Sequence, residues 1–205
     1  AAELLKGRRG GYGGVTFSGG EVTLLKDLPK MLIAARRAGY EHIGIITNGL
    51  LMAEPAYTDS LIAAGLGFCC VSIHGADAQL HDRMVRTAGA FEKVLRMLAL
   101  LEEREIPVVL NFVLTRENYR SAAAFVERFG GRRGVLEFQL YYPHYDGLMA
   151  EHAEQLALTM SDAVDAARRA FSAAAAVGAA DKIHLYNVPP CAASELTDRL
   201  RNWER

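Results

Sequence analysis

The stretch Gly13–Leu25, GGVTFSGGEVTLL, decides the fold. It begins with a short apolar segment, Val15–Phe17, which predicts a β-strand that breaks at Ser18-Gly19-Gly20 and is followed by Glu21. Two adjacent glycines let the backbone turn with positive φ and leave N–H groups open to a ligand. A carboxylate directly after such an opening could hold a cationic group such as an amine. Because short motifs of this kind also occur as plain βα turns, the surrounding sequence must decide between the two interpretations.

The composition indicates one soluble globular domain over residues 1–205. The chain is 51% hydrophobic and 23% charged, with a formal net charge of -1, so it can bury a sizeable core. It lacks the positive charge that would hold nucleic acid or an acidic membrane surface. No apolar run approaches the roughly 20 residues of a membrane span. The N-terminal AAELLKGRRGG places basic residues after apolar ones, which is the reverse of a signal peptide.

The cysteines predict a reducing, cytoplasmic location. Cys69, Cys70 and Cys191 are three in number, without paired spacing. An odd count of this kind does not indicate a disulfide framework. Cys69 and Cys70 are adjacent in a predicted strand and therefore point to opposite faces, which favours packing in the core. Cys191 follows Pro189-Pro190 and is more readily explained by a structural role than by metal binding.

Short apolar segments alternate with helical patterns along the whole chain. The predicted strands are Val15–Phe17, His42–Thr47, Phe68–Ile73, Pro107–Leu114, Val135–Tyr141 and Ile183–Tyr186. The predicted helices are one capped by Asp27 and ended by Gly39, one over Glu54–Ala64, one from Asp77, and others over Phe91–Leu101, Tyr119–Phe129 and Ser161–Val177. This order predicts right-handed βαβ units and a parallel sheet. Either a doubly wound sheet or an open, partial (β/α) barrel fits, and both place their ligand site at the carboxyl ends of the strands.

Polar residues gather at the predicted strand ends. They are Ser18 to Glu21, Thr47-Asn48-Gly49, Ser72 with His74, Asn111, and Tyr141 through His144. In VLEFQLY, alternation places Glu137, Gln139 and Tyr141 on one face of the strand. A doubly wound sheet covered by helices on both faces would have two apolar faces. The polar face therefore favours the partial barrel, with a polar ligand inside it.

The order of these motifs resembles that of the radical S-adenosylmethionine (radical SAM) enzymes. SGGEVTLL follows the first strand, ITNG ends the second and VSIHG ends the third. HDRMVRTAGAFEKVL and VVLNFVLTREN follow. The similarity runs from about Val15 to Tyr141, with a weaker echo at NVPPC. It implies a partial (β/α)6 barrel of TIM-barrel type.

The resemblance also implies roles for individual residues. Gly19, Gly20 and Glu21 match the GGE motif, whose backbone and carboxylate hold the methionine amino group of SAM. Ser72, with His74 beside it, matches a serine near the ribose or the methionine carboxylate. Arg86 matches a residue that pairs the SAM carboxylate, a task that suits the fork of a guanidinium, and Arg83 is its rival. Asn111 lies where polar side chains contact the ribose, and Asn48 is a weaker candidate. Candidates for substrate contact are Glu137, Gln139, Tyr141 and His144.

One part of the family pattern is absent. The family holds a [4Fe–4S] cluster with three cysteines in CxxxCxxC, on the loop after its first strand, because iron–sulfur clusters prefer thiolate ligands. This sequence contains no such motif. The strand before GGE corresponds to the family's second strand, so the first strand and the cluster loop are expected upstream of Ala1, and no metal ligands are expected in residues 1–205. Val22 also replaces the proline of the family's GGEPTL.

Three functions follow from the sequence. The first is a radical SAM core that, in the full protein, cleaves SAM to a 5′-deoxyadenosyl radical and abstracts a substrate hydrogen, although this chain alone is expected to be inactive. Its electron donor would be a flavodoxin or ferredoxin, and its substrate a small molecule or peptide. The second is a cluster-less SAM-binding domain or pseudoenzyme. The third is an unrelated barrel enzyme that uses Glu137 and His144 as acid and base.

Overall fold

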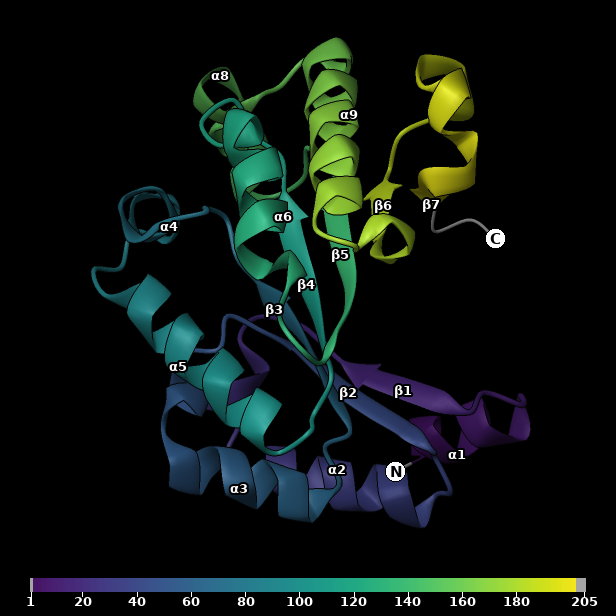
Figure 1. Ribbon diagram of the computed structural model, residues 1–205. Coiled ribbons are helices and arrows are strands. Elements are labelled where there is room, and N and C mark those ends of the chain that lie inside the picture. The colour runs from purple at the N-terminus through teal and green to yellow at the C-terminus, as the bar shows by residue number, and fades with distance from the viewer. Residues whose placement is uncertain (1, 202–205) are drawn as a thin grey trace. The chain divides into compact units, whose positions relative to one another are not determined.

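The computed structural model describes residues 2–201. The described residues form two compact units: unit 1 contains residues 2–72 and 92–109, and unit 2 contains residues 73–91 and 110–201. The strand order follows the chain from β1 to β7. Each unit combines parallel strands with helices, as the alternating sequence pattern predicts (Figure 1).

Unit 1 is built on three parallel strands. β1 (Gly14–Phe17) pairs with β2 (His42–Thr47), and β2 pairs with β3 (Phe68–Ser72). The helical segments are α1 (Ala2–Arg9), η1 (Val22–Leu24), α2 (Leu28–Arg37), η2 (Leu51–Ala53), α3 (Pro55–Ala64) and most of α5 (Ala90–Glu103). The apolar stripe of α2 explains its docking, because Leu28, Leu32 and Ala35 are completely buried.

Unit 2 holds the remaining strands, beginning within β4 (Val108–Val113). β5 (Val135–Tyr141) pairs in parallel with β6 (Ile183–Tyr186), which pairs with β7 (Leu200–Arg201). Its helices are α4 (Ala78–Val85), α6 (Ala122–Gly130), α7 (Leu148–Glu151), α8 (Ala153–Leu156) and α9 (Met160–Ala176). Short 3₁₀ helices are η3 (Tyr119–Ser121), η4 (Ala180–Lys182), η5 (Pro190–Ala192) and η6 (Ser194–Arg199).

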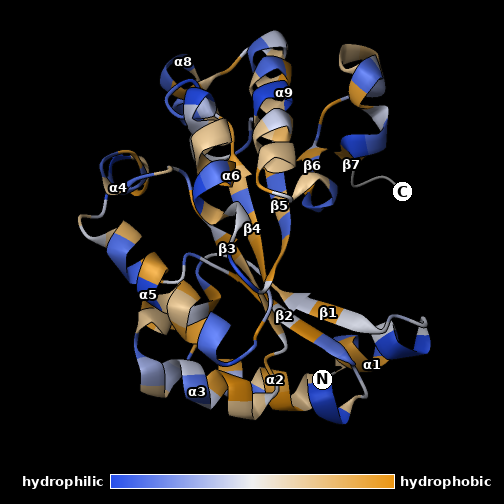
Figure 2. Ribbon diagram, viewed as in Figure 1, coloured by the Kyte–Doolittle hydropathy of each residue, from blue (hydrophilic) through white to orange (hydrophobic). Residues whose placement is uncertain are grey.

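The core of unit 2 is aromatic on one side and alanine-rich on the other. Phe125 of α6 lies 4.9 Å from Phe112 and 5.7 Å from Phe138, between ring centroids. Figure 2 shows that hydrophobic residues make up much of β4 and β5. α9 presents buried alanines such as Ala166 and Ala170. Small side chains let helices approach closely, which explains why an alanine-rich helix covers this core.

Most element boundaries are confirmed. β2, β5 and β6 span the residues predicted from the sequence. Asp27 occupies the N-cap position of α2, as predicted, but its carboxylate makes no capping hydrogen bond and instead accepts from Lys30 Nζ at 2.7 Å. The helix predicted from Ser161 begins earlier: Thr159, two residues before Ser161, caps α9, and its hydroxyl accepts from Asp162 N at 3.1 Å.

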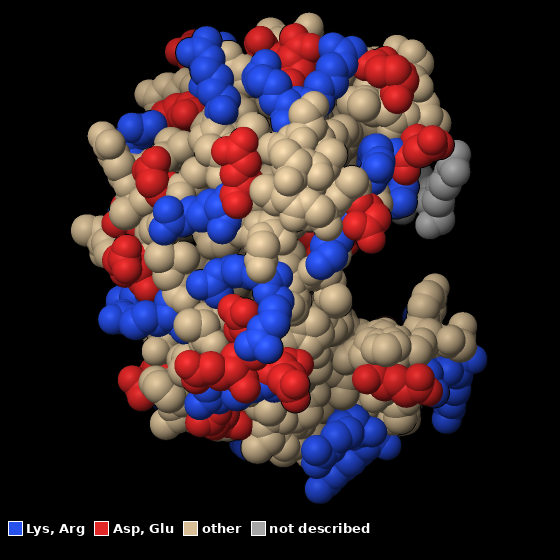
Figure 3. Space-filling view, in the orientation of Figure 1, with Lys and Arg blue, Asp and Glu red and all other residues tan. Residues whose placement is uncertain are grey.

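Charges of both signs are mixed over the visible face (Figure 3). Among residues 2–201, no helix is long and apolar enough to cross a membrane. Both observations agree with the composition, since a nearly neutral chain has no large single-sign field.

Candidate functional site

The GGE turn of unit 1 is open to a ligand. Ser18, Gly19 and Gly20 are exposed between β1 and η1. Gly19 has φ 147°, a backbone conformation that residues with a Cβ rarely adopt. A Cβ added at either glycine would meet no atom within 4 Å. The glycines therefore provide accessible main chain rather than a packed corner.

The Glu21 carboxylate fastens this turn to the end of β2. Its Oε1 accepts hydrogen bonds from Thr23 N at 3.1 Å, Thr23 Oγ1 at 2.6 Å and Thr47 Oγ1 at 2.6 Å. Its Oε2 accepts from Asn48 N at 2.7 Å. Oε1 is saturated, whereas Oε2 retains one lone-pair position. Glu21 therefore holds the turn in shape and has one acceptor position left for a ligand.

Asn48 and Ser72 lie at the carboxyl ends of their strands, as the sequence predicts. Asn48 follows β2, and its side-chain Oδ1 accepts from Leu50 N at 3.0 Å, as expected for a turn residue. Ser72 is the last residue of β3 and is half-buried. The structure brings Asn48 into direct contact with Glu21 through its backbone N–H. The role of Ser72 in ligand binding stays a prediction, which rests on its position at the carboxyl end of β3.

His74 and His81 belong to one buried cluster in unit 2. The backbone N–H of His74 donates to His81 Nδ1 at 3.1 Å. Asn118, a residue that the sequence analysis missed, donates from Nδ2 to the carbonyls of His74 and Val113. His81 therefore fixes the backbone at His74. The sequence analysis did not relate Asn118 to His74, because the His74 carbonyl that it binds lies 44 residues away.

Gly75 allows α4 to pack against this cluster. A Cβ at Gly75 would lie 2.5 Å from His81 N and 3.0 Å from its Cα, both backbone atoms. We expect Gly75→Ala to lower the free energy of unfolding by about 2–3 kcal/mol, because α4 must shift. Urea denaturation followed by circular dichroism measures this loss. Gly131→Ala is the control, since its Cβ would meet nothing within 4 Å; equal stability losses in the two variants would contradict the account.

His74 is neutral at pH 7 and has an unused ring nitrogen. Burial, followed by the neighbouring His81, lowers the pKa of His74 from 6.5 to about 4. Its Nδ1 is buried and has no hydrogen-bond partner. Among residues 2–201, Asn111 Oδ1 on β4 is the other buried side-chain atom without a hydrogen-bond partner. Buried polar atoms normally have partners, so each atom is suited to a hydrogen bond from a ligand.

The lowered pKa of His74 predicts a loss of stability in acid. The folded state favours the neutral imidazole, so this contribution is complete above the unfolded pKa of 6.5 and is lost as pH falls towards about 4. We expect the free energy of unfolding, measured by urea denaturation, to differ less between pH 7 and pH 5 for His74→Asn than for the unmodified chain. NMR titration should place the midpoint of the His74 imidazole near 4. A midpoint near 6.5 would contradict the burial that the structure shows.

Arg86 ends α4 and is exposed. It adopts the left-handed conformation, with φ 53° and ψ 37°, at the C-cap of the helix. Its rival Arg83 is also exposed, and its Nε lies 3.6 Å from Glu117 Oε2. Arg86 thus remains accessible to an anionic ligand, whereas Arg83 is engaged with a carboxylate.

Three of the four predicted substrate residues form one hydrogen-bonded network in unit 2. Gln139 Nε2 donates to Glu137 Oε2 at 2.8 Å, and Tyr141 OH donates to Gln139 Oε1 at 3.1 Å. β6 adds His184 and Tyr186, which the sequence analysis did not select. Alternation in IHLY places both on one face of β6, and that signal could have found them.

His144 does not join this network. It lies exposed after β5, and no contact described within residues 2–201 links it to Glu137. The histidine that contacts Glu137 is His184, whose Nδ1 lies 2.7 Å from Oε1. The predicted acid–base pair of Glu137 and His144 therefore finds no support, because parallel pairing brings β6, not the loop after β5, beside Glu137.

The cysteines do not form a metal site. Cys69 is buried, Cys70 is half-buried and Cys191 is exposed in η5. Burial raises the pKa of the Cys69 thiol, which therefore does not present a thiolate. Within residues 2–201, no group of three His, Cys, Asp or Glu side chains could hold a metal ion. The described residues thus do not fit an iron–sulfur cluster.

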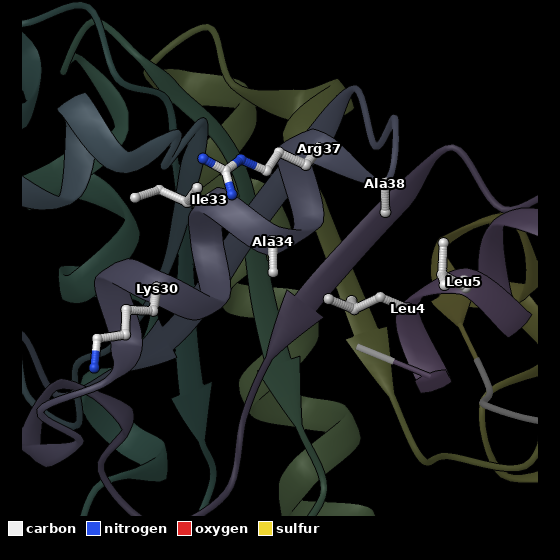
Figure 4. Close-up of a pocket in the computed structure, with 7 residues that line it drawn as sticks. All are labelled: Leu4, Leu5, Lys30, Ile33, Ala34, Arg37 and Ala38. Atoms are coloured by element: carbon white, nitrogen blue, oxygen red, sulfur yellow. The ribbon is translucent and has the colours of Figure 1, made fainter.

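The grooves of unit 1 lie apart from the predicted site residues. Figure 4 shows one, of about 560 Å³, where Leu4 and Leu5 of α1 lie opposite Ala34 and Ala38. A second, of about 590 Å³, is lined by Val15 and Phe17 of β1 together with charged residues such as Asp27 and Lys30. Neither is lined by residues of the GGE turn. They are features of the α1–β1–α2 region.

Comparison with known proteins gives a consistent result. Residues 1–129 match the model of the radical SAM superfamily. A probable GTP 3′,8-cyclase of Saccharolobus solfataricus is 32% identical over 142 residues, covering 69% of this chain and 45% of the relative. A PqqA peptide cyclase of Xanthomonas euvesicatoria is 34% identical over 166 residues, covering 75% and 42%. The chain thus spans less than half the length of these relatives.

Solved structures show the same fold. A domain of pyruvate-formate lyase-activating enzyme from Bacteroides vulgatus matches 85% of this chain and 99% of its own, with a TM-score of 0.61 and 19% identity. The enzyme anSMEcpe, solved with bound AdoMet and a peptide, matches 89% of this chain and 54% of its own, with a TM-score of 0.66 and 18% identity. The expected fold class, an α/β partial barrel with parallel strands, is confirmed.

Proposed function

Since this chain belongs to the radical SAM superfamily, we propose that it is the SAM-binding core of an enzyme. The full protein would cleave SAM reductively and use the 5′-deoxyadenosyl radical to abstract a hydrogen from its substrate. The single observation that carries this proposal is the family match over residues 1–129, which includes the GGE turn. The relatives named as enzymes support the same class of chemistry.

The polar groups of the chain suit SAM. For the methionine ammonium we propose the open main chain of Gly19 and Gly20 and the free lone pair of Glu21 Oε2. For the ribose hydroxyls we propose Asn111 Oδ1 and His74 Nδ1, which lack donors. The complete proposed cofactor-binding set is Gly19, Gly20, Glu21, Asn48, Ser72, His74, Arg86 and Asn111. Of these, Arg86 supplies the cation for the SAM carboxylate.

The cluster requires ligands from outside the described residues. In this family the cluster supplies the electron that cleaves SAM, and three cysteines bind it. Since residues 2–201 contain no fitting group, we propose that these cysteines belong to a segment that precedes Ala1. A flavodoxin or ferredoxin would deliver the electron. The chain of 205 residues alone is then expected to be inactive.

The edge of β1 supports a preceding strand. Among the described strands, β1 has β2 as its neighbour and begins the strand order. We propose that α1 and β1 are the second half of a βαβ unit, whose first strand would pair with the other edge of β1. The groove beside Val15 and Phe17 could receive side chains of that strand.

An extended protein tests the proposal. The gene's upstream codons are expressed with residues 1–205, and the product is reconstituted anaerobically with iron and sulfide. We expect reduction to release methionine and 5′-deoxyadenosine, whereas the chain of residues 1–205 and a variant with the upstream cysteines changed to serine release neither. A reconstituted protein that carries the cluster but neither binds nor cleaves SAM would contradict the proposal.

A second candidate is a SAM-binding domain without a cluster. The lack of a fitting metal-ligand group in residues 2–201 favours it. The upstream codons distinguish the two functions, because this candidate predicts no closely spaced cysteines there. Isothermal titration with SAM would still show binding to the chain, and reduction would yield no 5′-deoxyadenosine.

A further inference from the structure

Three donors converge on the Glu137 carboxylate in unit 2. Its Oε1 accepts from Tyr186 OH at 2.8 Å and lies 2.7 Å from His184 Nδ1. Its Oε2 accepts from Gln139 Nε2 at 2.8 Å. A carboxylate only accepts hydrogen bonds and offers two lone pairs on each oxygen. Both lone pairs of Oε1 are therefore occupied, whereas Oε2 has one lone pair free to accept a hydrogen bond.

The histidine that contacts Glu137 also contacts Arg201. Arg201 Nη2 lies 3.0 Å from His184 Nε2, and a guanidinium can only donate. Nε2 must therefore carry its lone pair towards Arg201, which places the ring proton on Nδ1, facing Glu137. His184 thus donates its Nδ1 hydrogen to the Glu137 carboxylate.

Apart from the imidazole of His184, the Glu137 carboxylate has no ion-pair partner in the described part of the chain. The imidazole of His184 separates Arg201 from the Glu137 carboxylate. Arg201 therefore offsets the negative charge less than an arginine in direct contact would. Lys182 Nζ binds the Val135 carbonyl at 3.0 Å instead. The Glu137 side chain is 22% exposed. A carboxylate this far removed from water is stabilised by a contacting cation, and its remaining exposure lets a ligand reach it.

Two tyrosines complete a surface that suits a cation. The rings of Tyr141 and Tyr186 stack with centroids 4.6 Å apart and an interplanar angle of 25°. Their hydroxyls are held by Gln139 and Glu137, respectively. Burial, followed by the contact with Glu137, raises the pKa of Tyr186, which therefore stays a neutral phenol. Aromatic faces attract ammonium and guanidinium groups.

We propose that Glu137, Tyr141 and Tyr186 form a subsite for a cationic nitrogen of the substrate, either a primary ammonium or a guanidinium. The inference deepens the proposed function, on which it rests, by giving the substrate a chemical class. Glu137 Oε2 receives the hydrogen bond and the charge of the ligand, and the tyrosine rings contact the carbon next to its nitrogen. His184 and Gln139 are positioning residues that keep the carboxylate in place.

Matched ligands test the charge preference on the unmodified chain. The probes are Nα-acetyl-lysine amide and Nα-acetyl-arginine amide, against the uncharged Nα-acetyl-norleucine amide and Nα-acetyl-citrulline amide. NMR titration follows the side-chain amide of Gln139 and the imidazole of His184. We expect each charged probe to bind at least about tenfold more tightly than its neutral counterpart, a difference of about 1.4 kcal/mol. Equal affinities would overturn the proposal without any variant.

A charge-removing variant locates the effect. Glu137→Gln keeps the size of the side chain, and we expect it to reduce the affinity of the charged probes to that of the neutral ones. Glu127→Gln removes a carboxylate that is exposed on α6 and should leave both affinities unchanged. Undiminished binding in Glu137→Gln would overturn the assignment. These measurements need neither SAM nor a cluster. Their outcome is therefore independent of SAM binding, which is measured separately, so either proposal can be contradicted while the other is supported.

Discussion

Replacing Glu21 with alanine is expected to weaken SAM binding by about 10- to 100-fold, the loss that removing one charge-assisted hydrogen bond produces. The same change should lower the free energy of unfolding by about 2–4 kcal/mol, because buried donors lose their partner. Those donors are the hydroxyls of Thr23 and Thr47 and the N–H of Asn48. Isothermal titration with SAM, on the extended and reconstituted protein, and urea denaturation of the chain measure the two effects.

Two further variants separate shape from charge. Glu21→Gln can still accept hydrogen bonds through its amide oxygen, so it should retain more stability than Glu21→Ala. Its affinity for SAM should nevertheless be lower than that of the unmodified protein, because the negative charge that faces the ammonium is gone. Glu54→Ala is the control, since Glu54 is exposed at the start of α3 and makes no capping hydrogen bond. SAM affinity that stays unchanged in Glu21→Ala would remove the assignment of this carboxylate.

Replacing Phe125 with alanine is expected to cause the largest loss of stability, about 3–5 kcal/mol. Phe125 is 0% exposed, and its ring lies 4.9 Å from Phe112, 5.4 Å from Phe129 and 5.7 Å from Phe138, between centroids. Removing it leaves a cavity that the neighbouring rings cannot fill without leaving their rotamers. Urea denaturation followed by far-UV circular dichroism measures the change.

Leu136→Ala is the matched control for this prediction. Leu136 lies on β5, two residues before Phe138, but it is 56% exposed. Its replacement should change the free energy of unfolding by no more than about 0.5 kcal/mol. A loss in Phe125→Ala as small as that in Leu136→Ala would show that the aromatic cluster does not stabilise unit 2.

The sequence by itself determined the order and type of strands β1 to β6 and of the longer helices between them, but it did not predict β7, α7 or α8. Hydrophobic periodicity and turn residues are local signals, so strands such as His42–Thr47 and Val135–Tyr141 were predicted to the residue. The GGE turn was also predictable, because two adjacent glycines at the end of a strand favour a turn with positive φ. Even local signals failed where two neighbouring residues could both cap a helix, as with Thr159 and Ser161.

Only the tertiary structure decided which side chains act together. Glu137 could be selected from alternation along its own strand, but its partner proved to be His184, 47 residues later, rather than the nearby His144. The contact depends on the register that pairs Gln139 with His184, and no local pattern specifies a register between distant strands. The same holds for Glu21, whose carboxylate binds Thr47, 26 residues away. Periodicity shows which face a residue occupies, whereas hydrogen bonding between strands selects its neighbour.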